Sequence, residues 1–147
     1  MTDSREDSPM LRGLTTVTYF ADDVPAAVRW YAAVTGTEPY FVRPEEGPPA
    51  YVEFRLGDLQ HELGILDRRY APSAPGPAGA GVVVYWAVDD ARASFARLLS
   101  SGATVHQEPI ERGPGYVTAS VVDPFGNVLG VMANQHYLDV VGGLVAG

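Results

Sequence analysis

The chain has 147 residues, of which 46% are hydrophobic, 10% aromatic and 19% charged, a composition that can supply one domain with a sizeable core. The formal net charge is −8 and the ten basic residues are all arginines without a basic stripe, which argues against nucleic acid as a partner. Because cysteine and lysine are both absent, disulfides, thiolate zinc sites, cysteine nucleophiles and lysine Schiff bases are excluded.

The chain begins with a polar, acidic segment. Its first ten residues contain no apolar region of the signal-peptide kind, and no later run reaches the length of a membrane span. We therefore expect a flexible N-terminal tail over residues 1–11 and a cytoplasmic protein.

The first regular elements are a strand followed by a capped helix. Residues 14–20 read as a strand, and the apolar stripe within residues 24–35 predicts an amphipathic helix. Asp23 is placed to accept the free N–H groups of the first helical turn, and Gly36 suits the left-handed position that ends a helix.

The same pattern occurs a second time. Residues 82–88 read as a strand, residues 91–101 as a helix with Asp90 as its N-cap, and Gly102 as its end. Between the two copies, residues 71–81 are rich in proline, alanine and glycine and predict a linker. A feature repeated in the same order indicates a duplicated structural unit.

Each copy continues into extended segments. In the first, residues 51–56 and 59–66 predict a hairpin. In the second, residues 116–122 and 128–132 flank residues 123–127, whose sequence Asp-Pro-Phe-Gly-Asn is typical of a turn.

This arrangement resembles the vicinal oxygen chelate superfamily, which contains glyoxalase I, extradiol dioxygenases, fosfomycin-inactivating transferases and bleomycin-resistance proteins. The resemblance covers about residues 12–138, and its most specific pieces are residues 23–36, 85–90 and 123–130. The closing Asn-Gln-His-Tyr-Leu of residues 134–138 is similar to the end of many small bacterial members.

The resemblance implies an α+β fold of two tandem βαβββ modules, whose mixed sheets curl around an open cup. The modules would span residues 12–70 and 82–134, with a C-terminal tail over residues 135–147. Two such chains commonly pair, so a homodimer is expected.

In the metal-dependent members of this family, four positions that face the cup hold an ion. The resemblance places these positions on Thr16, Glu62, Val83 and Gly130. Only Glu62 is a plausible ligand, and a divalent transition metal needs three or four nitrogen or oxygen donors. We expect no metal cofactor, with a divalent ion held weakly by Glu62 as the alternative. A one-residue slip in strand register would exchange Glu62 for His61 and leave the number of ligands at one.

Hydroxyl and aromatic side chains would complete the binding surface of the cup, as in other small-molecule pockets. The predicted ligand-binding residues are Thr16, Thr18, Tyr40, Tyr51, Glu62, Val83, Tyr85, Tyr116, Thr118, Ser120, Gly130 and Met132. Glu62 could serve as a general base or as an anchor for a cationic ligand, and the structural alternative is that it pairs with Arg55.

Three functions follow from this pattern. The first is a metal-independent protein that binds a small molecule, cationic or antibiotic-like, in the manner of the bleomycin-resistance proteins. The second is a lyase or isomerase of the glyoxalase kind with Glu62 as the catalytic base. The third is a structural or regulatory subunit whose own tail fills the cup. Fold alone does not choose among them.

Overall fold

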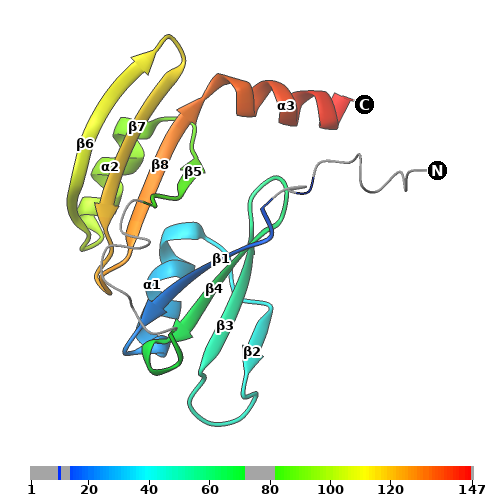
Figure 1. Cartoon of the computed structure of the whole chain (residues 1–147), viewed down its shortest axis with the longest axis vertical. Coiled ribbons are helices and arrows are strands. Elements are labelled where there is room, and N and C mark those ends of the chain that lie inside the picture. Colours follow the sequence, from blue (N-terminus) through cyan, green and yellow to red (C-terminus); the bar gives the residue numbers. More distant parts are fainter. Residues whose placement is uncertain (1–9, 11–13, 72–81, 147) are drawn as a thin grey trace.

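The structure, a computed structural model, describes residues 10, 14–71 and 82–146, so most of the expected tail over residues 1–11 and of the linker over residues 71–81 lies outside the described residues. Two curved four-stranded sheets, each with a helix on one face, lie next to each other, and a third helix projects from the second sheet (Figure 1). The first module contains β1 (Thr16–Ala21), α1 (Val24–Thr35), β2 (Phe41–Arg43), β3 (Tyr51–Leu56), β4 (His61–Asp67) and the 3₁₀ turn η1 (Arg68–Tyr70). The second contains β5 (Tyr85–Ala87), α2 (Ala91–Ser100), β6 (Thr104–Gly113), β7 (Tyr116–Val122), β8 (Val128–Asn134) and α3 (Gln135–Ala146).

Both sheets have the same topology. Their strand orders are β1-β4-β3-β2 and β5-β8-β7-β6. In each sheet the first strand runs parallel to the last strand of its module, and the other neighbours are antiparallel. The predicted pair of βαβββ modules is therefore confirmed, and β1 and β5 are each an edge strand of their sheet.

The first helix begins and ends where the sequence predicts. The Asp23 carboxylate accepts the backbone N–H of Ala26 at 3.0 Å, and Gly36 ends α1 with φ of 69°, a left-handed conformation that costs glycine little. Asp90 caps α2 in the same way, by accepting the N–H of Ala93 at 3.0 Å. The second helix ends at Ser100, one residue earlier than predicted.

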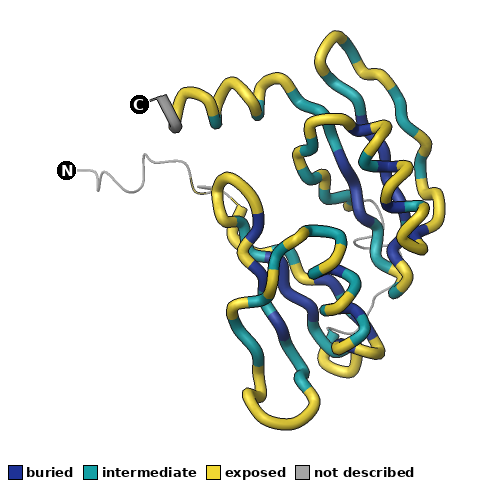
Figure 2. Tube along the Cα trace, turned by 180° about the vertical axis from the view of Figure 1, so that it is seen from behind, coloured by how far each residue is buried: buried dark blue, intermediate teal, exposed yellow. Residues whose placement is uncertain are grey.

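Apolar residues of the two modules form one continuous core beneath the two helices. On the sheets the core residues alternate with residues of the open face, as the period of a strand requires. Phe54, Leu63 and Val121 are almost fully buried, and burial of each such side chain stabilises the fold by roughly 1.5–3 kcal/mol. Figure 2 shows the buried segments along the central strands of both modules.

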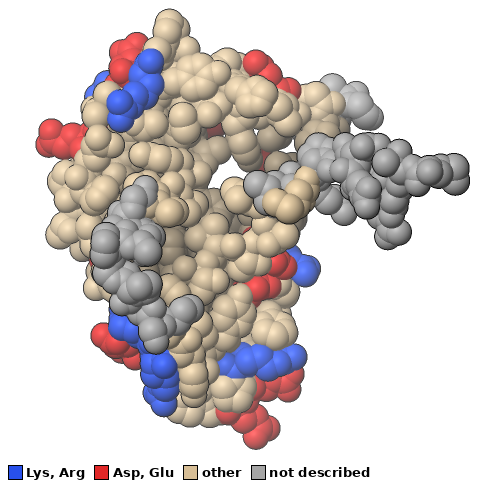
Figure 3. All heavy atoms as spheres, in the orientation of Figure 1, with Lys and Arg blue, Asp and Glu red and all other residues tan. Residues whose placement is uncertain are grey.

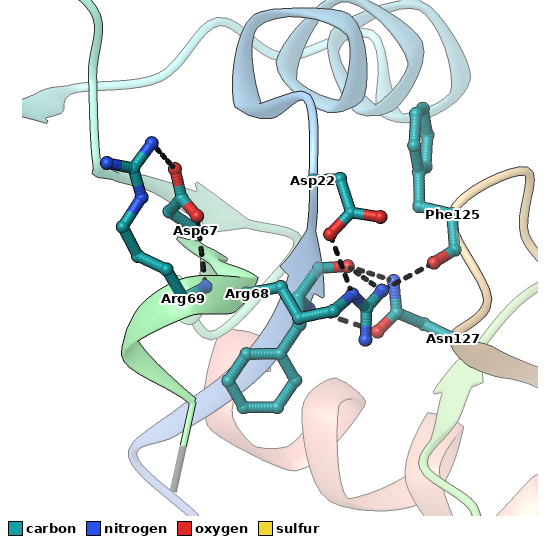
Figure 4. Close-up of polar contacts among 7 residues, drawn as sticks. Asp22, Asp67, Arg68, Arg69, Phe125 and Asn127 are labelled. Carbon is teal, nitrogen blue, oxygen red and sulfur yellow. Dashed lines mark hydrogen bonds and ion pairs between the residues drawn. The ribbon is translucent and has the colours of Figure 1, made fainter.

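The two modules are joined at one end of β1 by the side chain of Asn127. Its amide accepts the backbone N–H of Phe20 at 3.0 Å and donates to the carbonyl of Phe20 at 2.9 Å. The amide therefore occupies the edge of β1 as a neighbouring strand would. Arg68 reinforces this contact, because it donates to the carbonyl of Phe125 at 2.8 Å and pairs with Asp22 at 3.2 Å (Figure 4).

Asp123 holds the turn that carries Asn127. It is buried, with 3% of its surface exposed. One carboxylate oxygen accepts the backbone N–H groups of Phe125 and Asn127, at 2.9 and 2.8 Å. The other accepts the hydroxyl of Tyr31 of α1 at 2.5 Å, which ties the turn to the first module. We call the contacts made by Arg68, Asp123 and Asn127 across the modules the clasp.

The C-terminal segment differs from the expected tail. Residues predicted as a tail over 135–147 form α3, which starts where the Asn134 side chain accepts the N–H of Tyr137 at 2.9 Å. This capping contact explains the helix, because Asn is a preferred N-cap residue. α3 extends away from the two sheets (Figure 1). Within the described part of the chain, no helix is long and apolar enough to cross a membrane.

Candidate functional site

A cavity of about 540 Å³ lies between the two modules. Figure 3 shows an opening in the middle of the molecule whose visible walls are mostly uncharged. The apolar lining consists of Leu14, Val17, Val34, Leu56, Leu63, Val84, Ala87, Val88, Leu98, Leu129, Val131 and Met132. The aromatic and ionisable lining consists of Tyr31, Asp58, His61, Glu62, Tyr85, Trp86, Arg97 and Tyr137.

The position of the cavity follows from the topology. β1 and β5 are edge strands, and residues of both line the cavity. The clasp joins the modules at the Phe20 end of β1, whereas the cavity lies towards Thr16 at the other end of that strand. The volume falls within the range of roughly 300–1,000 Å³ that is typical of small-molecule sites.

A hydrogen bond between α3 and the first module also connects the modules beside the cavity. The hydroxyl of Tyr137 in α3 donates to Asp58, in the turn between β3 and β4, at 2.9 Å. Both residues line the cavity. The pKa of Tyr137 is raised because it is partly buried and because its hydroxyl donates to the Asp58 carboxylate. This contact therefore borders the cavity.

Glu62 lies on the wall of the cavity. The register of β1 and β4 places it opposite Thr16, whose hydroxyl donates to it at 2.8 Å. Arg55 on β3 approaches the other carboxylate oxygen at 4.0 Å, and the hydroxyl of Tyr40 donates to that same oxygen at 3.3 Å. The suggested arginine partner is therefore near Glu62, and Thr16 is a further hydrogen-bond donor to it.

A second carboxylate, Glu53, adjoins Glu62 on the open face of the first sheet. Tyr51 donates a hydrogen bond to Glu53 at 2.5 Å, and Tyr40 also donates to it. Burial and the nearby charge of Glu62 raise the pKa of Glu53 above its ordinary value. Burial and the Glu62 charge also raise the pKa of Tyr51, so its hydroxyl remains a donor. We call Tyr40, Tyr51, Glu53, Arg55 and Glu62 the carboxylate cluster.

The open face of the second sheet carries three more predicted residues away from the cavity lining. Ser120 is buried and shares a hydrogen bond of 2.8 Å with His106, and Thr118 accepts a hydrogen bond from Arg112 at 3.2 Å. Tyr116 lies opposite Asn134 at the far end of the same strand pair. The side-chain hydrogen bonds of Ser120 and Thr118 therefore lie within this sheet.

The predicted residue Gly130 has a packing role that the sequence did not indicate. A Cβ atom at this position would lie 2.7 Å from the Tyr85 ring and 2.7 Å from the carbonyl oxygen of Val84. Glycine therefore leaves room for Tyr85, which lines the cavity with 39% of its surface exposed. Gly64 makes similar room for the ring of Tyr51 in the first module.

Residues at the family's metal positions do not fit a metal ion. Thr16 and Glu62 are neighbours, but the register pairs Gly130 with Tyr85 and not with Val83. Whichever of Val83 and Tyr85 is taken, the second module offers at most one phenol oxygen. In the described part of the chain, no group of three or more histidine, cysteine or acidic side chains is arranged to hold a metal. The donors are too few for a selective divalent site.

The structure divides the predicted binding residues into two sets. Those that line the cavity are Thr16, Glu62, Tyr85 and Met132. Those that lie outside its lining are Thr18, Tyr40, Tyr51, Val83, Tyr116, Thr118, Ser120 and Gly130.

Several lining residues were missed by sequence reasoning. Trp86, which packs against the core, also lines the cavity. Asp58 was read only as a turn residue and Tyr137 only as part of the tail. For Glu53, the period of β3 could have given a signal, because it shares a face with Tyr51.

The family model described as "Glyoxalase/Bleomycin resistance protein/Dioxygenase superfamily" matches residues 13–131 of the chain. Solved structures share its fold. A glyoxalase/bleomycin resistance protein/dioxygenase superfamily member from Sphaerobacter thermophilus is 17% identical, with a TM-score of 0.64 and coverage of 84% of this chain and 98% of that chain.

Two proteins of Agrobacterium tumefaciens are also similar. Protein ATC0852 is 25% identical, with a TM-score of 0.63 and coverage of 84% of this chain and 98% of that one. A lactoylglutathione lyase is 22% identical, with a TM-score of 0.60 and coverage of 84% and 95%. No curated protein sequence matches the chain.

Proposed function

Because the chain belongs to the glyoxalase/bleomycin resistance protein/dioxygenase superfamily, we propose that it is a metal-independent protein that binds a small organic molecule in the cavity between its modules. The observation that carries this proposal is the cavity of about 540 Å³ with mostly apolar and aromatic walls and a few placed polar groups. Such a composition is typical of pockets that bury a ligand and fix its orientation by a few polar contacts.

Glu62 supports a ligand that carries positive charge. It lines the cavity together with Asp58, and its carboxylate is held by Thr16. In a wall that is otherwise largely apolar, an oriented carboxylate favours a cationic group on the ligand. Glu62 is thus the anchor in this proposal.

A thermal-shift screen in the presence of EDTA tests the proposal. The compounds screened would be small aromatic amines, amidines, acids and neutral molecules. We expect some of them to raise the melting temperature of the wild type, because a ligand that binds only the folded state stabilises it by mass action. Substitution of Ala87→Phe, which fills part of the cavity, should abolish the shift. Ala96→Phe, on the exposed side of α2, is the matched control and should retain it.

Three outcomes of this screen would contradict the proposal. If no compound stabilises the wild type, or if Ala87→Phe responds like the control, binding in this cavity is refuted. A shift that appears only after a divalent metal is supplied would refute the metal-independent part.

The second candidate is a glyoxalase-type lyase or isomerase with Glu62 as the general base. The proximity of Glu53 and Glu62 favours it, since two adjacent carboxylates can differ in protonation and so divide acid and base roles. Turnover of a lyase substrate by metal-free protein, lost in Glu62→Gln, would support this candidate over simple binding.

The third candidate, a cup filled by the protein's own tail, has less support. α3 projects from the body of the molecule (Figure 1), and Tyr137 is the residue of its described part that lines the cavity.

We also propose that the chain forms a homodimer in which α3 takes part. Leu138, Val140 and Leu144 of this helix are exposed, and such apolar side chains on a projecting helix suit a subunit contact. Light scattering should give twice the mass of one chain, and Leu138→Asp with Leu144→Asp should shift the protein towards the monomer.

A further inference from the structure

The guanidinium group of Arg55 occupies a position between an aromatic ring and a carboxylate. Its central carbon lies 4.1 Å from the centroid of the Tyr40 ring, and one of its nitrogens lies 4.0 Å from Glu62. A planar cation over a ring face and beside a carboxylate gains both cation–π and ionic attraction. The first sheet therefore holds a planar cation between the Tyr40 ring and the Glu62 carboxylate.

The Tyr40 ring and the Glu62 carboxylate are oriented by contacts that do not involve Arg55. Tyr40 is oriented by hydrogen bonds from its hydroxyl to Glu53 and Glu62, and Thr16 fixes the other oxygen of Glu62 at 2.8 Å. The ring and the carboxylate would keep these contacts if the arginine side chain moved away.

Arg55 is loosely held. Its side chain is 53% exposed, and its distance to Glu62 is at the upper limit for an ion pair. An exposed pair of this kind is worth roughly 0.2–1 kcal/mol. A ligand that also buries an apolar part in the adjoining cavity would gain more than Arg55 loses.

Two carboxylates face one arginine here. Glu53 and Glu62 carry two negative charges when ionised, and the raised pKa of Glu53 reflects its burial and the nearby Glu62 charge. A ligand cation that takes the place of Arg55 would keep this repulsion offset. Glu62 and Thr16 also line the cavity, so the position of the guanidinium adjoins the space for the rest of a ligand.

We propose that the ligand carries a planar, delocalised cation, a guanidinium or amidinium, which displaces the Arg55 guanidinium from the Tyr40 ring and Glu62 while its apolar part occupies the cavity. This proposal rests on the proposed function, because it names the chemical class of the molecule bound there. A compact ammonium group fits less well, because it is more strongly hydrated and cannot stack as a plane on the ring.

The test uses two probes of similar shape. Benzamidine has a planar amidinium and benzylamine a tetrahedral ammonium, each on the same phenyl ring. Calorimetric titrations in EDTA would compare the wild type, Arg55→Met, Glu62→Gln and the control Arg92→Met, which removes the same charge from the exposed side of α2. Melting curves would establish that each variant is folded.

We expect the wild type to bind benzamidine more tightly than benzylamine. Removal of the internal competitor in Arg55→Met should tighten benzamidine binding by roughly 3- to 10-fold and benzylamine binding by less. Glu62→Gln should weaken benzamidine binding by about 10-fold, and Arg92→Met should leave it unchanged.

Each contrary result has its own meaning. Equal tightening of both probes by Arg55→Met would show a general charge effect and overturn the proposal, as would no tightening beyond the control. If benzamidine fails to bind while a neutral or anionic compound binds in a manner blocked by Ala87→Phe, the cation proposal is wrong and the proposed function stands. If nothing binds in the cavity, both are wrong.

Discussion

Glu53 and Glu62 show how the side chains around the cavity are set in place by neighbouring strands. Each carboxylate accepts hydrogen bonds from hydroxyl groups, Glu53 from Tyr51 and Glu62 from Thr16. The contacts involve β1, β3 and β4, together with Tyr40 just before β2. The orientation of these carboxylates therefore depends on the whole first sheet. Loss of one hydroxyl donor should alter the orientation of both carboxylates.

Protonation of Glu53 should make stability depend on pH. Because its pKa in the folded protein is raised above 4.5, the folded state holds this proton more tightly than the unfolded chain does. The resulting stabilisation is present below pH 4.5 and is lost as the pH rises through the raised pKa. The groups that face Glu53 are Tyr40, Tyr51, Arg55 and Glu62.

Glu53→Gln removes this dependence. The free energy of unfolding of the wild type, relative to that of the variant, should fall as the pH rises from 4.5 through the raised pKa of Glu53. Urea denaturation at several pH values would measure the difference. A difference that is constant with pH, or that grows as the pH rises, would contradict the raised pKa of Glu53 in the folded protein.

Gly130 and Gly64 provide a paired test of the packing around the two tyrosines. Gly130→Ala would bring a methyl group against the Tyr85 ring and the backbone carbonyl of Val84, both 2.7 Å from the added atom. Gly64→Ala would meet only the end of the Tyr51 side chain, which can rotate. We expect Gly130→Ala to lower the free energy of unfolding by about 1–3 kcal/mol and Gly64→Ala to cost less. Denaturant titrations that reverse this order would refute the packing role of Gly130.

At the scale of elements, the clasp connects the modules through side chains that replace a missing strand partner. Asn127 satisfies both backbone groups of Phe20, and Asp123 satisfies the turn that carries Asn127. The hydroxyl of Tyr31 donates a hydrogen bond to the second oxygen of the Asp123 carboxylate. Burial and the Asp123 charge raise the pKa of Tyr31, so this hydroxyl stays protonated. The modules are therefore joined where β1 ends, and the cavity lies towards its other end.

Asn127→Ala should weaken this junction. The variant leaves the N–H of Phe20 without its Asn127 partner and the carbonyl of Phe20 with the longer contact to Arg68 at 3.4 Å, which should cost about 1–3 kcal/mol of unfolding free energy. Asn134→Ala is the matched control, since it removes one cap of α3 and should cost about 1 kcal/mol. Thermal denaturation would compare the two, and a smaller loss in Asn127→Ala than in the control would exclude the clasp as a main contact between the modules.

The elements differ in how far the sequence could predict them. α1 and β7 have the predicted bounds, because Asp23 and Gly36 are strong helix signals and the turn at residues 123–127 fixes the end of β7. β5 is shorter than the strand predicted over residues 82–88, since regular pairing with β8 covers only Tyr85–Ala87. α3 was read as a tail although Asn134 offers a capping signal. Its exposed apolar residues give no single buried face from which a helix is usually recognised.

The site was predictable only in part, for a physical reason. The family resemblance placed Thr16 and Glu62 among the positions that face the cup, and the register of β1 and β4 makes them neighbours. The relation of Glu53 to Glu62 depends on the pairing of β3 with β4, and the role of Tyr137 depends on how α3 leaves the second sheet. Contacts of this kind between distant segments are not encoded by local spacing.

At the scale of the whole molecule, two modules share one hydrophobic core and leave a cavity beside it. The metal positions of the family lack the donors that a metal needs, while the cavity wall keeps a carboxylate. In the proposed function, the fold of the superfamily carries a site that binds an organic cation without a metal. A bound ligand would touch both modules, since residues of both line the cavity.

The titration of metal-free protein with benzamidine tests this account most directly. After treatment with EDTA, the wild type should bind benzamidine at one site per chain, and Glu62→Gln should bind it about 10-fold more weakly. Added zinc should change neither result. Binding that requires the metal, or equal binding by wild type and Glu62→Gln, would contradict the account.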